Sequence, residues 1–136
     1  MGHMNVLTLL VPKKDVDTIT SGDTLRQAVS KLNFHHYTDI PVLSEQGHYL
    51  YSISAGDMLF YMAEKELTLR ESEDVSIDVV PVHRSARALP FTATVKEIGQ
   101  VLLEQNYVPL VDERGIFMGI ITRKRFASNA MKYIED

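Results

Sequence analysis

Two short stretches decide the fold: Tyr37-Thr38-Asp39-Ile40-Pro41-Val42-Leu43 and, later in the chain, Asn106-Tyr107-Val108-Pro109-Leu110-Val111. Each is apolar, rich in β-branched residues and bounded by polar residues, which is typical of a strand. A glycine turn follows each one, at Gly47 and at Gly115. The two prolines are 68 positions apart, and so are the two glycines. The chain therefore contains one structural unit twice, and this repetition determines the architecture.

Both copies predict the same order of elements: a lead-in strand, a helix, a hairpin of two strands and a second helix. Apolar residues recur at i, i+3, i+4 and i+7 from Leu25, which predicts the first helix over residues 24–34. For the first copy we also predict a lead-in strand at 16–20, a hairpin of 40–43 with 49–53, and a second helix from Ala55 to about Leu69. The matching segments of the second copy are 88–92, a helix opening at 93–98, a hairpin through Gly115, and a helix from Arg123 to about Ile134. Short helical or coil pieces end at Pro12 and Pro81.

These segments give a domain organisation in four parts. We assign residues 1–4 to a tag remnant and start, 5–63 to the first repeat, 64–74 to a charge-rich linker, and 75–136 to the second repeat. A repeat of about 60 residues is too small to bury a large core alone. We therefore expect an α/β fold in which two β-α-β-β-α repeats pack face to face as one pseudo-symmetric unit.

Composition excludes several classes of protein. The 136 residues include no cysteine, which removes disulfides, thiol nucleophiles and cysteine-bound metal centres. No apolar run approaches the ~18–20 residues that span a bilayer, so we expect no membrane insertion. The lack of cysteine leaves the redox compartment open, and we take the cytoplasm as the default location. A net charge of −4 disfavours a broad nucleic-acid interface. The adjacent pair His35-His36, with His48 and His83, has no metal-ligand spacing, so we predict no metal site.

The repeated pattern resembles a pair of CBS domains, also called a Bateman module. The resemblance rests on an apolar-Pro-Val strand, a glycine turn, and an apolar strand that ends in Ser/Thr-x-x-Asp at the start of the second helix. Within that family the chain is most similar to small stand-alone CBS-pair proteins of Gram-positive bacteria, some of which bind cyclic di-AMP. The stretches 37–42 and 119–124 carry this closer similarity. The resemblance implies disc-shaped dimers whose clefts bind adenosine-containing ligands.

The first cleft that the resemblance implies is cationic. Where the family has an Asp that binds both ribose hydroxyls, this sequence has Arg125. The triplet Arg123-Lys124-Arg125 begins a predicted helix, whose N-terminus favours phosphate. This cleft therefore suits a cyclic dinucleotide or another phosphate-rich ligand. Its predicted residues are Val16, Asp17, Tyr37, Thr38, Asp39, Ile40, Ile121, Thr122, Arg123, Lys124 and Arg125.

The second cleft keeps the family pattern complete in Ser54-Ala55-Gly56-Asp57. By the resemblance, Asp57 would accept hydrogen bonds from the 2′- and 3′-hydroxyls of an AMP-type ligand, and Arg87 could contact its phosphate. The predicted residues of this cleft are Ala86, Arg87, Asn106, Tyr107, Val108, Ile53, Ser54 and Asp57.

Each of these assignments has a structural alternative. Asp57 can stabilise the first turn of its helix through the helix dipole without any ligand. The basic triplet can be an ordinary solvated helix face. Tyr37 and Tyr107, which we treat as equivalent positions, can stack on adenine or cap the core with their rings.

The function that follows is regulatory. The sequence has no nucleophile elbow, P-loop, HExxH or GxGxxG motif, so we predict that the chain is not an enzyme and needs no cofactor. We expect it to bind an adenine nucleotide (cyclic di-AMP or AMP first, then ADP and ATP), to form a homodimer through the second helices, including Phe60 and Met131, and to signal to an effector protein. The alternative is a structural dimerisation module that binds no ligand.

Overall fold

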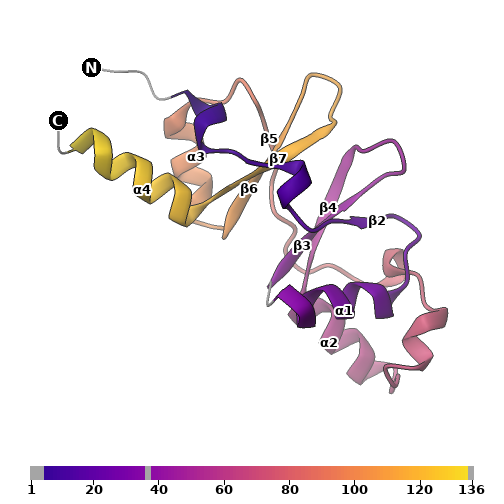
Figure 1. The fold of residues 1–136 in the computed structure, drawn as a ribbon. Helices are drawn as coiled ribbons and strands as arrows, with labels where there is room; N and C mark the ends of the chain where they lie inside the picture. The colour runs from indigo at the N-terminus through magenta and orange to yellow at the C-terminus, as the bar shows by residue number, and fades with distance from the viewer. Residues whose placement is uncertain (1–4, 36–37, 135–136) are drawn as a thin grey trace. The chain divides into compact units, whose positions relative to one another are not determined.

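The structure is a computed structural model that describes residues 5–35 and 38–134, and it divides the chain into two compact units (Figure 1). The continuous unit is Asp17–Ser85. The split unit runs up to Val16 and resumes at Ala86. Each unit has its own sheet, helices and hydrophobic core. The predicted mixed α/β fold is confirmed.

The continuous unit has a three-stranded sheet in the order β2-β3-β4. β2 lies parallel to β3, and β3 forms an antiparallel hairpin with β4. Helices α1 and α2 contact each other beside this sheet (Figure 1). The element bounds are β2 Ile19–Thr20, α1 Leu25–His35, β3 Asp39–Leu43, β4 Tyr49–Ser54, α2 Ala55–Glu64, and the 3-10 helices η3 Glu71–Asp74 and η4 Ile77–Val79.

The split unit has a four-stranded sheet in the order β1-β7-β6-β5. β5 lies parallel to β6, which forms an antiparallel hairpin with β7. This repeats the pattern of the continuous unit, with β1 added on the far side of β7. The element bounds are η1 Val6–Leu9, β1 Val11–Pro12, η2 Lys13–Asp15, β5 Leu89–Pro90, α3 Val95–Leu102, β6 Tyr107–Val111, β7 Phe117–Thr122 and α4 Arg123–Ile134.

The segment that precedes the lead-in strand of each repeat, called its leading segment here, is buried in the core formed by the other repeat. Val6 and Leu9, which precede the first lead-in strand, are buried in the core of the split unit, whose other members come from the second repeat. Ile77 and Val80, which precede the second lead-in strand, are buried with the first repeat in the continuous unit. The compact units therefore differ from the sequence repeats in where the chain is divided.

Gly119 allows β1 to join the split sheet. Val11 and Pro12 pair with Ile120 and Gly119 in antiparallel register. Gly119 has φ 151°, and a Cβ atom there would lie 2.1 Å from the carbonyl oxygen of Val11. A glycine inside an apolar strand can mark a close approach of another backbone, and here that backbone is β1.

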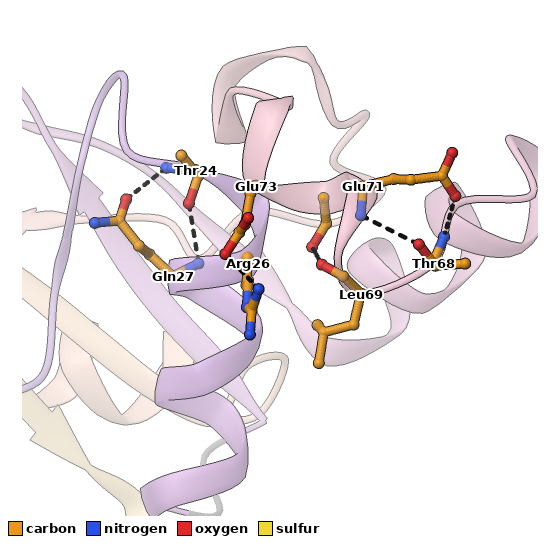
Figure 2. Close-up of polar contacts among 8 residues, drawn as sticks. Thr24, Arg26, Gln27, Thr68, Leu69, Glu71 and Glu73 are labelled. Carbon is orange, nitrogen blue, oxygen red and sulfur yellow. Dashed lines mark hydrogen bonds and ion pairs between the residues drawn. The ribbon is translucent and has the colours of Figure 1, made fainter.

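The segment between the repeats is folded onto the continuous unit. Helix α2 ends at Glu64 rather than near Leu69, because Glu66 takes a left-handed backbone conformation with φ 53°. Figure 2 shows the chain beyond it held by reciprocal hydrogen bonds between Thr68 and Glu71, and by an ion pair between Arg26 of α1 and Glu73. Residues 64–74, which we predicted as a solvated linker, thus contact α1 through η3.

Candidate functional site

The first part of the candidate site is the junction of β4 and α2 in the continuous unit. The hydroxyl of Ser54 accepts a hydrogen bond from the backbone N–H of Asp57 at 3.0 Å, and the carboxylate of Asp57 accepts one from the backbone N–H of Ser54, also at 3.0 Å. This reciprocal pair is a capping box, which a Ser followed three residues later by an acid forms at a helix start. The structural alternative for Asp57, stabilisation of the first helical turn, is therefore present in the structure.

Asp57 has a further partner that the sequence did not indicate. The second carboxylate oxygen, Oδ1, accepts a hydrogen bond from the backbone N–H of His83 at 3.1 Å, and it lies 2.9 Å from the Nδ1 atom of the same residue. The residue Asp57 is only 4% exposed, whereas the side chain of His83 is 65% exposed. Burial raises the pKa of Asp57, but the hydrogen bonds from Ser54 and His83 outweigh burial, so the net pKa is lowered.

The second part is the equivalent junction of β7 and α4 in the split unit, and its charge is opposite. The hydroxyl of Thr122 accepts a hydrogen bond from the backbone N–H of Arg125 at 3.1 Å, as Ser54 does from Asp57. The side chain at the third position is now a cation, so no capping box can close. Arg123, Lys124 and Arg125 are all exposed at the helix start.

These cations are in an electrostatically unfavourable place. The N-terminus of a helix carries a partial positive charge, and a cation there costs a few tenths to about 1 kcal/mol. One nitrogen of the Arg123 guanidinium already has a hydrogen-bond partner, because Nε donates to the carbonyl of Leu102 at 2.8 Å. Within the described residues, the side chains of Lys124 and Arg125 have no hydrogen bond or ion pair. The arrangement favours an anion at this junction.

The start of the first hairpin strand lies beside each helix start. The backbone N–H of Ala55 donates to the carbonyl of Thr38 at 2.8 Å, and that of Arg123 donates to the carbonyl of Asn106 at 3.4 Å. The predicted cleft residues just before each proline are thereby brought next to Ser54 in one unit and next to Thr122 in the other.

The strand registers correct our pairing of the two tyrosines. Tyr107 lies opposite Thr122, as Asp39 lies opposite Ser54, so Tyr107 is equivalent to Asp39 and not to Tyr37. The reason is the constant spacing of 68 in the hairpins, which relates residue 39 to residue 107. Tyr107 is 7% exposed, so its ring is largely in the core. Tyr37 lies outside the described residues.

Four predicted cleft residues have fully buried side chains. They are Ile40, Ile53, Val108 and Ile121, each at 0% exposed. Any contact of these residues with a ligand is therefore left to their backbone. Val16, Asp17 and Ala86 are half-buried, while Thr38 is exposed.

Gln105 positions Arg87 in the split unit, and the sequence reasoning missed it. Its side-chain amide accepts from the backbone N–H of Arg87 and donates to the carbonyl of Arg87, both at 2.9 Å. It also donates to the carbonyl of Tyr107 at 2.7 Å. The side chain of Arg87 stays exposed and borders a pocket of about 220 Å³ that also contains Glu97 and Glu104. A signal was available, since Gln105 is the counterpart of Tyr37 at the spacing of 68.

The described residues offer neither a metal site nor a membrane-spanning helix. Over residues 5–35 and 38–134, no group of three His, Asp or Glu side chains could hold a metal ion. In the same part of the chain, no helix has the length and apolar character needed to cross a membrane. Each predicted cleft takes residues from both units, and the pairing of the two halves stays a prediction.

Comparison with known proteins identifies the family. The CBS domain family profile matches residues 9–64 and residues 73–132. The chain belongs to the CBS domain family. The two matched segments correspond to the two sequence repeats, and proteins built of CBS pairs are generally regulatory rather than catalytic.

Solved CBS-pair proteins share the fold. A CBS domain protein from Streptococcus pneumoniae is 25% identical, with a TM-score of 0.84 over 96% of this chain and 88% of that one. The CbpB protein of Listeria monocytogenes in complex with c-di-AMP is 22% identical, with a TM-score of 0.79 over 97% and 98% of the two chains. CBSX2 in complex with AMP is 18% identical, with a TM-score of 0.76 over 97% and 98%. The predicted similarity to stand-alone CBS-pair proteins is confirmed.

One curated relative is a much longer protein. A homoserine O-acetyltransferase of Methanohalophilus mahii is 25% identical over 122 residues. The match covers 90% of this chain but only 23% of the acetyltransferase. The similarity is therefore at the level of a domain.

Proposed function

We propose that this CBS pair is a regulatory module that binds an adenine nucleotide and passes the bound state to a partner protein. The observation that carries the proposal is the exposed triplet Arg123–Arg125 at the start of α4, where the helix dipole and three cations favour phosphate. Similar folds that bind c-di-AMP or AMP support the same ligand class. The module needs no catalytic group and no cofactor for this role.

The cationic junction favours a phosphate-rich ligand such as cyclic di-AMP. An Arg guanidinium matches phosphate oxygens with two parallel hydrogen bonds, and Lys adds a point charge. At the β4–α2 junction, by contrast, Asp57 is acidic and already accepts three hydrogen bonds. We place the phosphates of the ligand at Thr122–Arg125, and the base and ribose toward Thr38 and Asp39 as the first predicted cleft requires.

Isothermal titration calorimetry with cyclic di-AMP and AMP tests this function. We expect the double variant Lys124→Ala with Arg125→Ala to bind cyclic di-AMP at least about ten-fold more weakly, because each lost hydrogen bond to a charged group is worth about 1.5–3 kcal/mol. These two side chains are chosen over Arg123, whose guanidinium also holds the carbonyl of Leu102.

Arg114→Ala is the matched control. Arg114 is a cation of the same unit, lies in the turn of the β6–β7 hairpin, and is exposed. Its loss is expected to leave cyclic di-AMP binding unchanged. Equal losses in both variants would assign the effect to net charge. Absence of binding to every adenine nucleotide by the wild-type protein would favour the structural dimerisation module instead.

For a module of this kind, signalling requires that the partner distinguishes the bound from the unbound form. We further propose that the protein acts as a homodimer through α2 and α4. The exposed Leu59 and Phe60 of α2 support this assembly. Sedimentation velocity with and without cyclic di-AMP measures it directly, and a monomer under both conditions would contradict it.

A further inference from the structure

We infer that His83 is a movable cover over Asp57, which lets the β4–α2 junction accept a vicinal diol only after its imidazole has left the carboxylate. This inference rests on the proposed function, because it concerns which nucleotides the module accepts. It uses only residues of the continuous unit.

Counting the hydrogen bonds of Asp57 shows why the junction is closed. A carboxylate offers about four lone-pair positions, two on each oxygen. The backbone N–H of Ser54 occupies one position on Oδ2, while the backbone N–H and the Nδ1 atom of His83 occupy both positions on Oδ1. The other position on Oδ2 faces the hydroxyl of Ser54, which can rotate away from it. A vicinal diol donates two hydrogen bonds, so it cannot be satisfied while the imidazole is in place.

The imidazole is the partner that can leave. The other two donors are backbone N–H groups, one at the helix cap and one in the chain that passes over it. The imidazole sits on a side chain that is 65% exposed, above a carboxylate that is itself buried. Its departure would free one lone pair on Oδ1, and with the other position on Oδ2 each carboxylate oxygen could then accept one hydroxyl of a diol.

A pocket beside the pair gives the ring space to turn. It has a volume of about 300 Å³ and is lined by Asp57, His83, Phe60, Tyr61 and Pro81, with Glu64, Lys65 and Val79 around it. The ring of Phe60 meets the imidazole edge to face, with ring centres 5.7 Å apart and an interplanar angle of 88°. The cover is thus held by one ring contact and one side-chain hydrogen bond.

The cover would discriminate between nucleotides by chemistry alone. AMP carries adjacent 2′- and 3′-hydroxyls, so its ribose must displace the imidazole to bind Asp57. A 3′,5′-cyclic dinucleotide has each 3′-oxygen in a phosphodiester and presents no vicinal diol. His83 therefore penalises AMP and leaves a cyclic dinucleotide unaffected.

The experiment compares three ligands on the full chain by calorimetry: AMP, 3′-deoxy-AMP and cyclic di-AMP. We expect His83→Ala to bind AMP about ten-fold more tightly than the wild type, because a competing hydrogen bond to a charged group is removed. Binding of 3′-deoxy-AMP and cyclic di-AMP is expected to stay unchanged. His48→Ala is the control, since His48 lies in the β3–β4 turn and contacts Ser44.

A second measurement needs no substitution. The imidazole resonances of His83 in the wild-type protein are expected to shift when AMP saturates the site and to stay in place with 3′-deoxy-AMP. Unchanged AMP affinity in His83→Ala, an equal gain for 3′-deoxy-AMP, or an unmoved imidazole would each overturn the cover while leaving cyclic di-AMP binding as evidence for the proposed function. Failure of the wild type and His83→Ala to bind any of the three ligands would overturn both.

Discussion

Asp57 shows at the scale of one residue that a family motif can stabilise the fold by itself. Its carboxylate closes a capping box with Ser54 and fixes the chain at His83, so it contributes to stability without any nucleotide. The sequence could predict the first of these roles, because the Ser and the acid are three positions apart. It could not predict the second, since His83 is 26 positions away and no local pattern links them.

The lowered pKa of Asp57 makes stability depend on pH in a definite direction. A carboxyl whose folded pKa lies below its unfolded value, about 3.9, contributes stability that is present above that value and is lost as the pH falls through the folded pKa. We expect Asp57→Asn to lower the free energy of unfolding at pH 7 by about 2 kcal/mol, because the new amide group faces a backbone donor.

Chemical denaturation between pH 7 and pH 3 measures this effect. The difference between Asp57→Asn and wild type is expected to shrink as the pH falls below about 4. Glu45→Gln, at an exposed position in the β3–β4 turn, is the control and is expected to follow the wild type. A constant difference at all pH values would show that the ionised form of Asp57 is not what stabilises the junction.

Hairpins and helices could be predicted at the scale of elements because their signals are local. Helix α4 runs from Arg123 to Ile134 as expected, and both hairpins turn at the predicted glycines. The end of α2 was wrong by about five residues, since a left-handed Glu66 has no sequence signature. The strand β1 was also missed, because two residues carry no periodicity and its partner β7 lies more than 100 positions away.

A substitution at Gly119 tests the pairing of β1 with β7. We expect Gly119→Ala to cost about 2 kcal/mol or more, because strain at positive φ adds to a collision with the carbonyl of Val11. Gly22→Ala is a matched control, because Gly22 also has a positive φ, +92°, but nothing lies within 4 Å of the added Cβ. This variant therefore has the backbone strain of a side chain at positive φ without a collision.

Thermal unfolding of both variants, with amide hydrogen exchange at residues 11, 119 and 120, separates the two contributions. Faster exchange in these strands is expected for Gly119→Ala only. Equal losses of stability in the two variants, with exchange unchanged, would mean that the β1–β7 approach tolerates a side chain.

The chain divides into two compact units whose boundaries differ from those of the sequence repeats. The repeats were visible in the sequence because matched prolines and glycines recur at one spacing. The exchange of leading segments was not visible, since Val6 and Ile77 are ordinary apolar residues whose partners lie in the other repeat.

We expect a fragment of residues 17–85 to fold alone, because its core has all its members within that range. A fragment of residues 5–63, cut at the sequence repeat, would lack Ile77 and Val80 and is expected to unfold without cooperativity. Circular dichroism with urea titration compares the two. Cooperative unfolding of 5–63 but not of 17–85 would contradict the division.

The exchanged segments also set an order of events during synthesis. Residues 6–12 leave the ribosome before the continuous unit, whereas their partners in β7 and in the core of the split unit are translated after it. The continuous unit can close as soon as residue 85 has emerged, since domains form as units when their chain is complete. Residues 6–12 must therefore wait, unpaired, until β7 has been translated more than 100 residues later. Within this chain, an early segment is then among the last to find its place.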